Sequence, residues 1–133
     1  KGGYSETTNP KESSEKIEDV KIDISEIELE YEIVNDSVLS SAKRIKAKYK
    51  NNTKYTITAL HITAAKKSGE DIFLMSSDTV KPGEISPIFD AIEFNSIQKS
   101  DISLTECTIR IQDESGATTY VAYDYKTNKY VFF

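Results

Sequence analysis

Several residue types that carry chemistry or crosslink small folds are scarce in this sequence. Its 133 residues include no tryptophan, one cysteine, one histidine and one methionine. A single cysteine excludes an intramolecular disulfide, which suits the cytosol and equally suits bacterial surface proteins that have no disulfides. A metal site requires several clustered ligands, and the one histidine, His61, stands among scattered carboxylates. We therefore expect no metal and no cofactor, with His61 on the surface of a strand.

The chain also lacks an excess of positive charge and a long apolar run. It has 17 Lys and Arg residues against 22 Asp and Glu residues, for a net charge of −5. A protein that binds duplex nucleic acid needs a basic surface to displace counterions, so we expect no nucleic-acid partner. No apolar run approaches the ~20 residues of a membrane helix, so we expect no transmembrane segment in this chain. Three prolines and five glycines exclude a collagen-like chain.

The sequence motifs of the common enzyme classes are absent as well. The chain has no Gly-x-Ser-x-Gly elbow, no His-Glu-x-x-His, no P-loop and no Gly-x-Gly-x-x-Gly. A catalytic triad would have to use His61, which has no motif around it. The many carboxylates leave a hydrolytic pair open, but most of them alternate with apolar residues, as on a solvated strand face. We expect a protein that is not an enzyme, with a hydrolase as the minor alternative.

The one cysteine, Cys107, stands in an alternating row with Ile109 and Ile111. Such a row predicts a buried thiol that behaves as a small apolar side chain and reacts slowly. A nucleophilic cysteine needs a basic neighbour to lower its thiol pKa, and the sequence identifies none. We therefore assign no catalytic residue.

What the sequence has in abundance is β-branched and aromatic residues. It contains 16 isoleucines, 12 threonines and eight tyrosines against five leucines. This bias favours strands over helices, because branched and aromatic side chains pack well on a pleated surface. With 38% hydrophobic residues, a chain of this length forms one domain around one core.

Period-two alternation is clearest in the middle of the chain's first half. Apolar side chains alternate up to Tyr49, turn formers occupy residues 51–53, and alternation resumes from Leu60 to Ala64. Successive side chains of a strand point to opposite faces, so this pattern predicts two half-buried strands with a polar break between them. The second strand, over residues 55–65, is predicted to be long and central, with a change of phase along it.

The N-terminal residues 1–16 contain one aromatic residue and no aliphatic residue. Because such a segment cannot bury enough apolar area to offset its ordering entropy, we expect a flexible, disordered linker. A single β-sandwich domain is predicted over residues 17–133. Its apolar residues alternate at even positions from Val20 to Ile24 and at odd positions from Ile27 onward. This change of face requires a bulge, a kink or a strand that changes sheets, and we favour a split first strand.

Two neighbouring predicted strands carry opposite charges on their outward faces. The first has glutamates at the even positions 26–32, and the second has basic residues at the even positions 44–50. If they pair antiparallel around a turn at residues 35–37, placing Glu30 opposite Lys48 sets Glu32 opposite Lys46 and Glu28 opposite Lys50. An acidic metal site beside a basic anion site is the alternative, but strand pairing requires nothing further. We predict an adjacent antiparallel pair in this register.

The remaining strands follow at short intervals with turn signals between them. Pro82-Gly83 indicates a type II turn, since proline fixes φ at the first central position and glycine supplies a positive φ at the second. Pro87 either splits the strand near Phe89 or places it at a sheet edge, and residues 91–103 predict a short helical turn or an irregular connection. Further strands are predicted over residues 72–75, 105–112, 118–125 and 130–133. This spacing predicts an antiparallel β-sandwich or a small barrel.

The order of features from Ile45 to Phe89 resembles a known bacterial family. A basic strand ends in Asn51-Asn52-Thr53, and a long strand and a turn at Ser68-Gly69 follow; Lys81-Pro82-Gly83-Glu84 then precedes Phe89. These motifs, which cover about a third of the chain, resemble FxLYD-type and related immunoglobulin-like domains of bacterial surface lipoproteins, mostly Gram-positive. The Phe-x-Leu-Tyr-Asp run itself is replaced here by Ile-Thr-Ala-Ala-Lys at residues 62–66. The resemblance implies an immunoglobulin-like β-sandwich without shared catalytic residues.

These observations lead us to expect a non-catalytic bacterial domain that acts outside the cytoplasm, at the cell surface or beyond it. It would serve as a spacer or protein-binding module, with a protein or cell-surface partner and a lipid anchor upstream of Lys1. The alternative is a carbohydrate-binding module, because exposed aromatic faces stack on sugars. Its candidate residues are the C-terminal tyrosines Tyr120, Tyr123, Tyr125 and Tyr130. Alternation with Val121 places two of these rings on the core face, which argues against this alternative.

Overall fold

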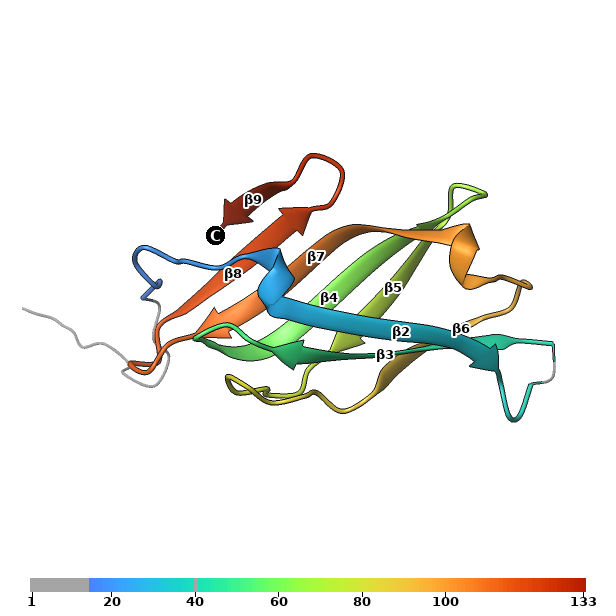
Figure 1. Cartoon of the computed structure of the whole chain (residues 1–133), viewed down its shortest axis with the longest axis horizontal. Helices are drawn as coiled ribbons and strands as arrows, with labels where there is room; N and C mark the ends of the chain where they lie inside the picture. The colour runs from blue at the N-terminus through green and yellow to red at the C-terminus, as the bar shows by residue number, and fades with distance from the viewer. Residues whose placement is uncertain (1–14, 40) are drawn as a thin grey trace, which may run out of the picture.

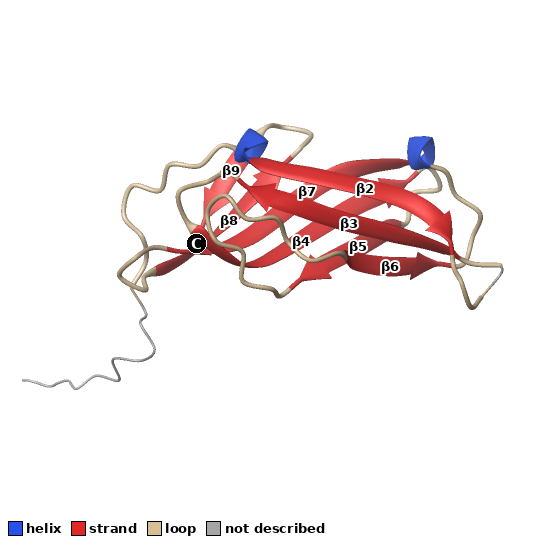
Figure 2. Ribbon diagram, turned by 60° about the horizontal axis from the view of Figure 1, so that its bottom comes forward, coloured by secondary structure: helices blue, strands red, loops and turns tan. Residues whose placement is uncertain are grey.

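The computed structural model describes residues 15–39 and 41–133 of the chain. These residues form two antiparallel sheets that pack face to face (Figure 1), and both sheets can be followed in Figure 2. One sheet has three strands in the order β2-β3-β6, and the other has five in the order β5-β4-β7-β8-β9. The elements are η1 (Ile24–Glu26), β2 (Ile27–Asn35), β3 (Lys43–Asn51), β4 (Thr56–Lys66), β5 (Asp71–Ser76), β6 (Phe89–Glu93), η2 (Lys99–Asp101), β7 (Ile102–Gln112), β8 (Thr118–Asp124) and β9 (Lys129–Phe132). The prediction of an all-β sandwich is confirmed.

The core lies between the two sheets and consists of alternating side chains. Ile45 and Tyr49 of β3 are fully buried, and Leu60 and Ile62 of β4 are buried opposite them. Ala47, between Ile45 and Tyr49, is buried as well, whereas Lys48 of β3 and His61 of β4 are exposed, so the period-two prediction is confirmed. Full burial of an isoleucine or leucine side chain stabilises a fold by about 1.5–3 kcal/mol, which makes this row the main source of stability.

β4 is long and central, as predicted for residues 55–65. It pairs with β5 along one edge and with β7 along the other. The register against β7 shifts between Ile57 and Ala59, so Thr58 is an extra residue and Leu60 returns to the core face. A bulge of this kind accounts for the change of phase in the sequence.

The prediction of a split first strand is wrong in its first half. Among the described residues, no strand precedes β2. The backbone ahead of it bonds to side chains of the five-stranded sheet: the N–H of Ile17 donates to Thr119 Oγ1 at 2.9 Å, and the N–H of Ile24 donates to Tyr130 Oη at 2.9 Å. The apolar side chains of this segment still pack on the core. Alternation identified which side chains face inward, but it carries no information on whether the backbone joins a ladder.

The change of face itself is real, and a kink produces it. Asp23 caps the short helix η1: its carboxylate accepts the N–H of Ser25 at 2.9 Å, and its own N–H donates to Glu26 Oε1 at 2.9 Å. This reciprocal arrangement satisfies two donors that a helix start leaves unpaired. The chain therefore turns at Ser25 and enters β2 on the opposite phase.

The acidic and basic strands pair in the predicted register. β2 and β3 are antiparallel, with Glu30 opposite Lys48, Glu32 opposite Lys46 and Glu28 opposite Lys50. In the part of the chain that the structure describes, none of these three pairs forms an ion pair within 4.0 Å. The charges therefore act on the choice of partner strand more than as individual bonds, because a wrong partner would set like charges opposite each other.

The turn predictions are also confirmed. Gly69 has a φ of 98° in the turn between β4 and β5, and Gly83 has a φ of 86° with a hydrogen bond from the N–H of Glu84 to the carbonyl of Lys81 at 3.0 Å. Positive φ is the reason that glycine occupies these two positions. Pro87 splits the following stretch, so that β6 begins only at Phe89 and lies at the edge of its sheet.

Two boundaries differ from the sequence analysis. The segment 91–103 contains the end of β6 and the short helix η2, and β7 begins at Ile102, three residues earlier than predicted. The predicted linker over residues 1–16 lies outside the described residues except for its last two. The carbonyl of Glu15 accepts the N–H of Thr118 at 3.1 Å, so contact with the sheet exists at that point.

The pairing of β2 with β3 makes a prediction about stability. Glu30→Lys places like charges opposite each other and should lower the free energy of unfolding by under about 1 kcal/mol, since the pair is exposed. Adding Lys48→Glu should restore most of this loss. A double-mutant cycle from urea unfolding at low salt measures the coupling, and the same cycle at high salt should give a smaller value. Zero coupling at low salt would show that the two rows are solvated independently.

Candidate functional site

The thiol of Cys107 lies in the core. The side chain is buried on the core face of β7, as predicted, and burial raises its thiol pKa to about 12. A nucleophilic cysteine needs the opposite shift, since the thiolate is the reactive form. Cys107 therefore acts as a core side chain.

His61 lies on the outer face of the five-stranded sheet, as predicted. It is exposed, stands opposite Met75 of β5 and Thr108 of β7, and has its ring 5.8 Å from that of Phe73. Within the described residues, no group of three or more His, Cys, Asp and Glu side chains is arranged to hold a metal ion. His61 thus lies beside the apolar side chains of Phe73 and Met75 on this face.

The C-terminal tyrosines do not form a common platform. Tyr123 is buried, and the half-buried rings of Tyr125 and Tyr130 pack against it with centroids 4.9 and 4.8 Å away. The hydroxyl of Tyr130 accepts the N–H of Ile24, so this ring holds the N-terminal segment on the sheet. Tyr120 alone among the four is exposed, and it stacks on Phe133 at 5.5 Å. Three of the four sugar-stacking candidates are therefore part of the packing.

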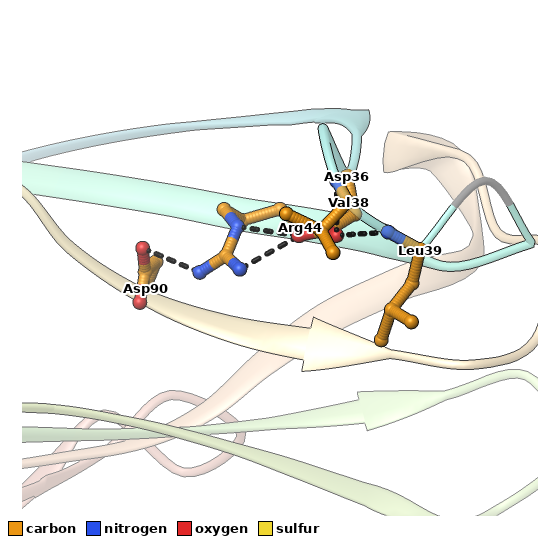
Figure 3. A network of polar contacts seen from close by, with 5 residues as sticks. All are labelled: Asp36, Val38, Leu39, Arg44 and Asp90. Atoms are coloured by element: carbon orange, nitrogen blue, oxygen red, sulfur yellow. Dashed lines mark hydrogen bonds and ion pairs between the residues drawn. The ribbon is translucent and has the colours of Figure 1, made fainter.

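A network of polar contacts centres on Asp36, at the end of the β2–β3 hairpin (Figure 3). The carboxylate is buried and accepts the N–H groups of Val38 and Leu39 at 2.9 and 2.6 Å. Arg44 donates to the other oxygen through Nε at 2.9 Å and Nη2 at 2.6 Å, and its Nη1 donates to Asp90 at 2.8 Å. These backbone bonds, first that from Leu39, and the guanidinium of Arg44 lower the pKa of Asp36.

This network and a second ion pair have structural roles. Arg44 lies on β3 and Asp90 on β6, so the guanidinium joins these strands while it fixes the loop after β2. Lys66, at the end of β4, pairs with Glu93 of β6 at 2.6 Å and so links the two sheets. Nothing in the sequence pointed to these partners, because Arg44 and Asp90 are 46 residues apart and Lys66 and Glu93 are 27 apart.

The outer face of the three-stranded sheet carries further charges, and apart from Arg44 and Asp90 those in its rows form no ion pair with a described residue. Rows of opposite charge run along it, with glutamates on β2, lysines on β3 and Asp90 on β6 opposite Lys46. A shallow hollow of about 250 Å³ lies over it, lined by Glu30, Tyr31, Glu32, Lys46, Ala47, Lys48 and Ile88. We call this surface the charged face.

The charged face ends at β2, whose outer backbone edge is free. At the two ends of the β2–β3 ladder, the N–H of Asn52 donates to Glu26 and the N–H of Asp36 donates to Ala42. Bonding alternates along an antiparallel pair, so the even-numbered residues of β2 bond to β3 and the odd-numbered ones turn their N–H and C=O groups away. In the described part of the chain, nothing pairs with that outer edge along residues 29–33. We call these residues the free edge.

Comparison with known proteins adds little to this picture. No protein-family model matches the sequence, and no match was found among curated proteins. A solved structure described as "X-ray structure of Northeast Structural Genomics Consortium target SoR45" is similar over 80% of this chain and 77% of its own, with a TM-score of 0.35 and 8% identity. A likeness of this level carries no argument about function. Among the described residues, no helix has the length and apolar character to cross a bilayer.

The buried carboxylate of Asp36 makes a prediction about acid stability. Its folded-state pKa is lowered, so it stabilises the fold above its unfolded pKa of about 3.9, and this stabilisation is lost as the pH falls through the folded value. Asp36→Asn should lower the urea midpoint at neutral pH, and the difference from the parent should shrink below about pH 4. Asp71→Asn, at an exposed position, is the control. A difference that stays constant down to the lowest pH would contradict the role of the charge.

The buried thiol makes a second prediction. With a pKa near 12 and a side chain that is 2% exposed, Cys107 should react with a thiol reagent far more slowly in the native protein than in concentrated guanidinium. The native rate should follow the opening of the sandwich and so increase when urea is added below the unfolding midpoint. Labelling of the native protein at the rate of a free cysteine would show that the thiol is accessible and would revive its reading as a nucleophile.

Proposed function

We propose that this chain is a non-catalytic immunoglobulin-like domain of a bacterial surface protein or lipoprotein, located outside the cytoplasm, and that it acts as a spacer or protein-binding module. The observation that carries the proposal is that the candidate reactive and binding side chains are engaged in the fold, whereas two surfaces are left open. Cys107 and the C-terminal tyrosines other than Tyr120 are packed, and Asp36 and Lys66 are engaged in structural ion pairs. The features left open, the charged face and the free edge, suit contact with a protein more than a reaction.

The strand pairing supports the immunoglobulin-like part of the proposal. In that fold the first strand pairs with the second, the second with the fifth, the third with the sixth and the sixth with the seventh. Here β2 pairs with β3, β3 with β6, β4 with β7, and β7 with β8, which are the same four pairings. The fourth strand, β5, pairs with the third strand instead of the fifth, and β9 is an addition at the far edge.

The two alternatives have less support. A carbohydrate-binding module would use the C-terminal tyrosines, and three of those rings pack against one another, with Tyr130 also bonded to the N-terminal segment. A hydrolase would need two carboxylates that are free to act in a cleft. Those of Asp36, Asp90, Glu70 and Glu93 are instead held in ion pairs with Arg44 or Lys66. No observation favours either over a binding module.

The proposed location is tested in the source organism, with the gene intact, including everything upstream of this chain. Antibodies against the domain should label intact cells, and added protease should remove the epitope without lysis, because a surface domain is reachable from outside. A cytoplasmic protein probed in the same samples is the control and should stay protected. An epitope that becomes accessible only after lysis would refute the surface location.

A further inference from the structure

We propose that the free edge of β2 binds an extended peptide strand in which lysine or arginine alternates with aliphatic residues. The inference rests on the proposed function as a protein-binding module. It does not depend on the proposed surface location. In this mode of recognition the added strand continues the sheet: backbone hydrogen bonds give affinity, and side chains at alternate positions give specificity.

β2 is the longest edge strand in the described part of the chain. It has nine residues and pairs with β3 without a break in register, whereas β6 has five residues and β9 has four. β6 also follows Pro87 and lies beside β5 of the other sheet, and β5 is six residues long. Natural proteins protect edge strands by shortening, bulges, proline or cover. β2 has no shortening, bulge or proline along residues 29–33, and its one printed cover there is Lys99 of η2, whose Nζ lies 4.6 Å from the centre of the Tyr31 ring.

The charges on β2 indicate which side chains an added strand would need. Across the charged face the strands alternate in sign, with Asp90 on β6, lysines on β3 and glutamates on β2. A strand added beyond β2 would continue this alternation if it were basic. The carboxylates of Glu28, Glu30 and Glu32 have no hydrogen bond or ion pair to any described residue, so they are free to accept one.

On the inner side of the free edge, the added strand would need aliphatic residues between its basic ones. Leu29, Tyr31 and Ile33 are half-buried and pack on the margin of the core. Residues directly opposite each other in an antiparallel pair share a face, so the residues of the added strand opposite these three would cover their exposed parts. These are also the positions at which the backbone of β2 offers its outward N–H and C=O groups.

The same charges disfavour a second copy of this chain that joins through its β2 or its β6. Two β2 strands side by side would place glutamates against glutamates on one face. Joining β2 of one copy to β6 of another would place a glutamate beside Asp90. Like charges directly opposite are destabilising, so the edge discourages self-association while it favours a basic strand.

The probe that tests the proposal is a short synthetic peptide in which lysine alternates with valine. In the free protein, the amides of Leu29, Tyr31 and Ile33 should exchange with solvent rapidly and those of Glu28, Glu30 and Glu32 slowly, because only the latter bond to β3. Adding the peptide at low salt should slow exchange at the three odd positions. Protection at another edge, or loss of protection at the even positions, would overturn the proposal, since the latter would mean that the peptide replaces β3.

Two matched controls separate strand addition from simple charge attraction. N-methylation of the peptide at its valines should abolish binding, because these amides face β2, whereas N-methylation at its lysines should leave binding intact. Equal effects of the two patterns would overturn the proposal. In the protein, Glu30→Lys removes one charge pair with the peptide and should weaken binding by about two- to fivefold. Glu114→Lys makes the same charge change in a distant turn and should not weaken binding.

This test and the cell-surface test fail independently. A peptide that does not bind removes the free edge as a binding site and leaves the surface location standing. An epitope protected inside intact cells removes the surface location and leaves strand addition at β2 to be judged by exchange alone. A peptide with glutamate in place of lysine should not bind, and its binding would overturn the assignment of a basic partner.

Discussion

The arrangement depends on one buried amide, that of Asn51, at the point where the chain leaves the three-stranded sheet for the five-stranded one. Asn51 is fully buried at the end of β3. Its side chain donates to the carbonyls of Tyr55 and Val80 and accepts from the N–H and hydroxyl of Thr53, and its backbone bonds to Gly83 and Glu84. Every donor of this residue is used, and each bond replaces one to water that burial removed. A buried group left unpaired costs about 1–3 kcal/mol, so these bonds fix the crossing.

Fixing Asn51 sets the position of much that follows. The carbonyl of Val80 and the turn at Gly83 are held against the end of β3, which brings the stretch after Pro82 alongside it. That placement gives β6 its pairing with β3 and leaves β2 at the other edge. The hydroxyl of Tyr49 gives a contrast two residues away: it is the one buried side-chain polar atom in the described part of the chain without a partner. The unpaired hydroxyl of Tyr49 lowers the stability of the fold, whereas the fully bonded amide of Asn51 raises it.

The sequence was sufficient where a local pattern decides the structure and insufficient where distant contacts do. Charge and phase together determined the register of β2 against β3, because a slip of one residue would have turned every side chain over. They did not separate the extended segment at Val20 from a true strand, since both present alternate side chains to the core. Asn51 was recognised as a turn former, but its burial depends on Val80, 29 residues away. The ion pairs at Arg44 had no local signal for the same reason.

The free edge could not be predicted from the periodicity of the sequence at all. Alternation tells which face a residue occupies, but it does not tell whether a strand has one neighbour or two. Only the sheet order shows that β2 has a single partner, and only then do its glutamates acquire a second meaning. A row of one charge on an edge strand repels an identical strand and attracts one of opposite charge. The glutamates that would disfavour the pairing of two β2 strands would thus also select a basic partner. Selecting against one strand while admitting another is what specificity at a sheet edge requires.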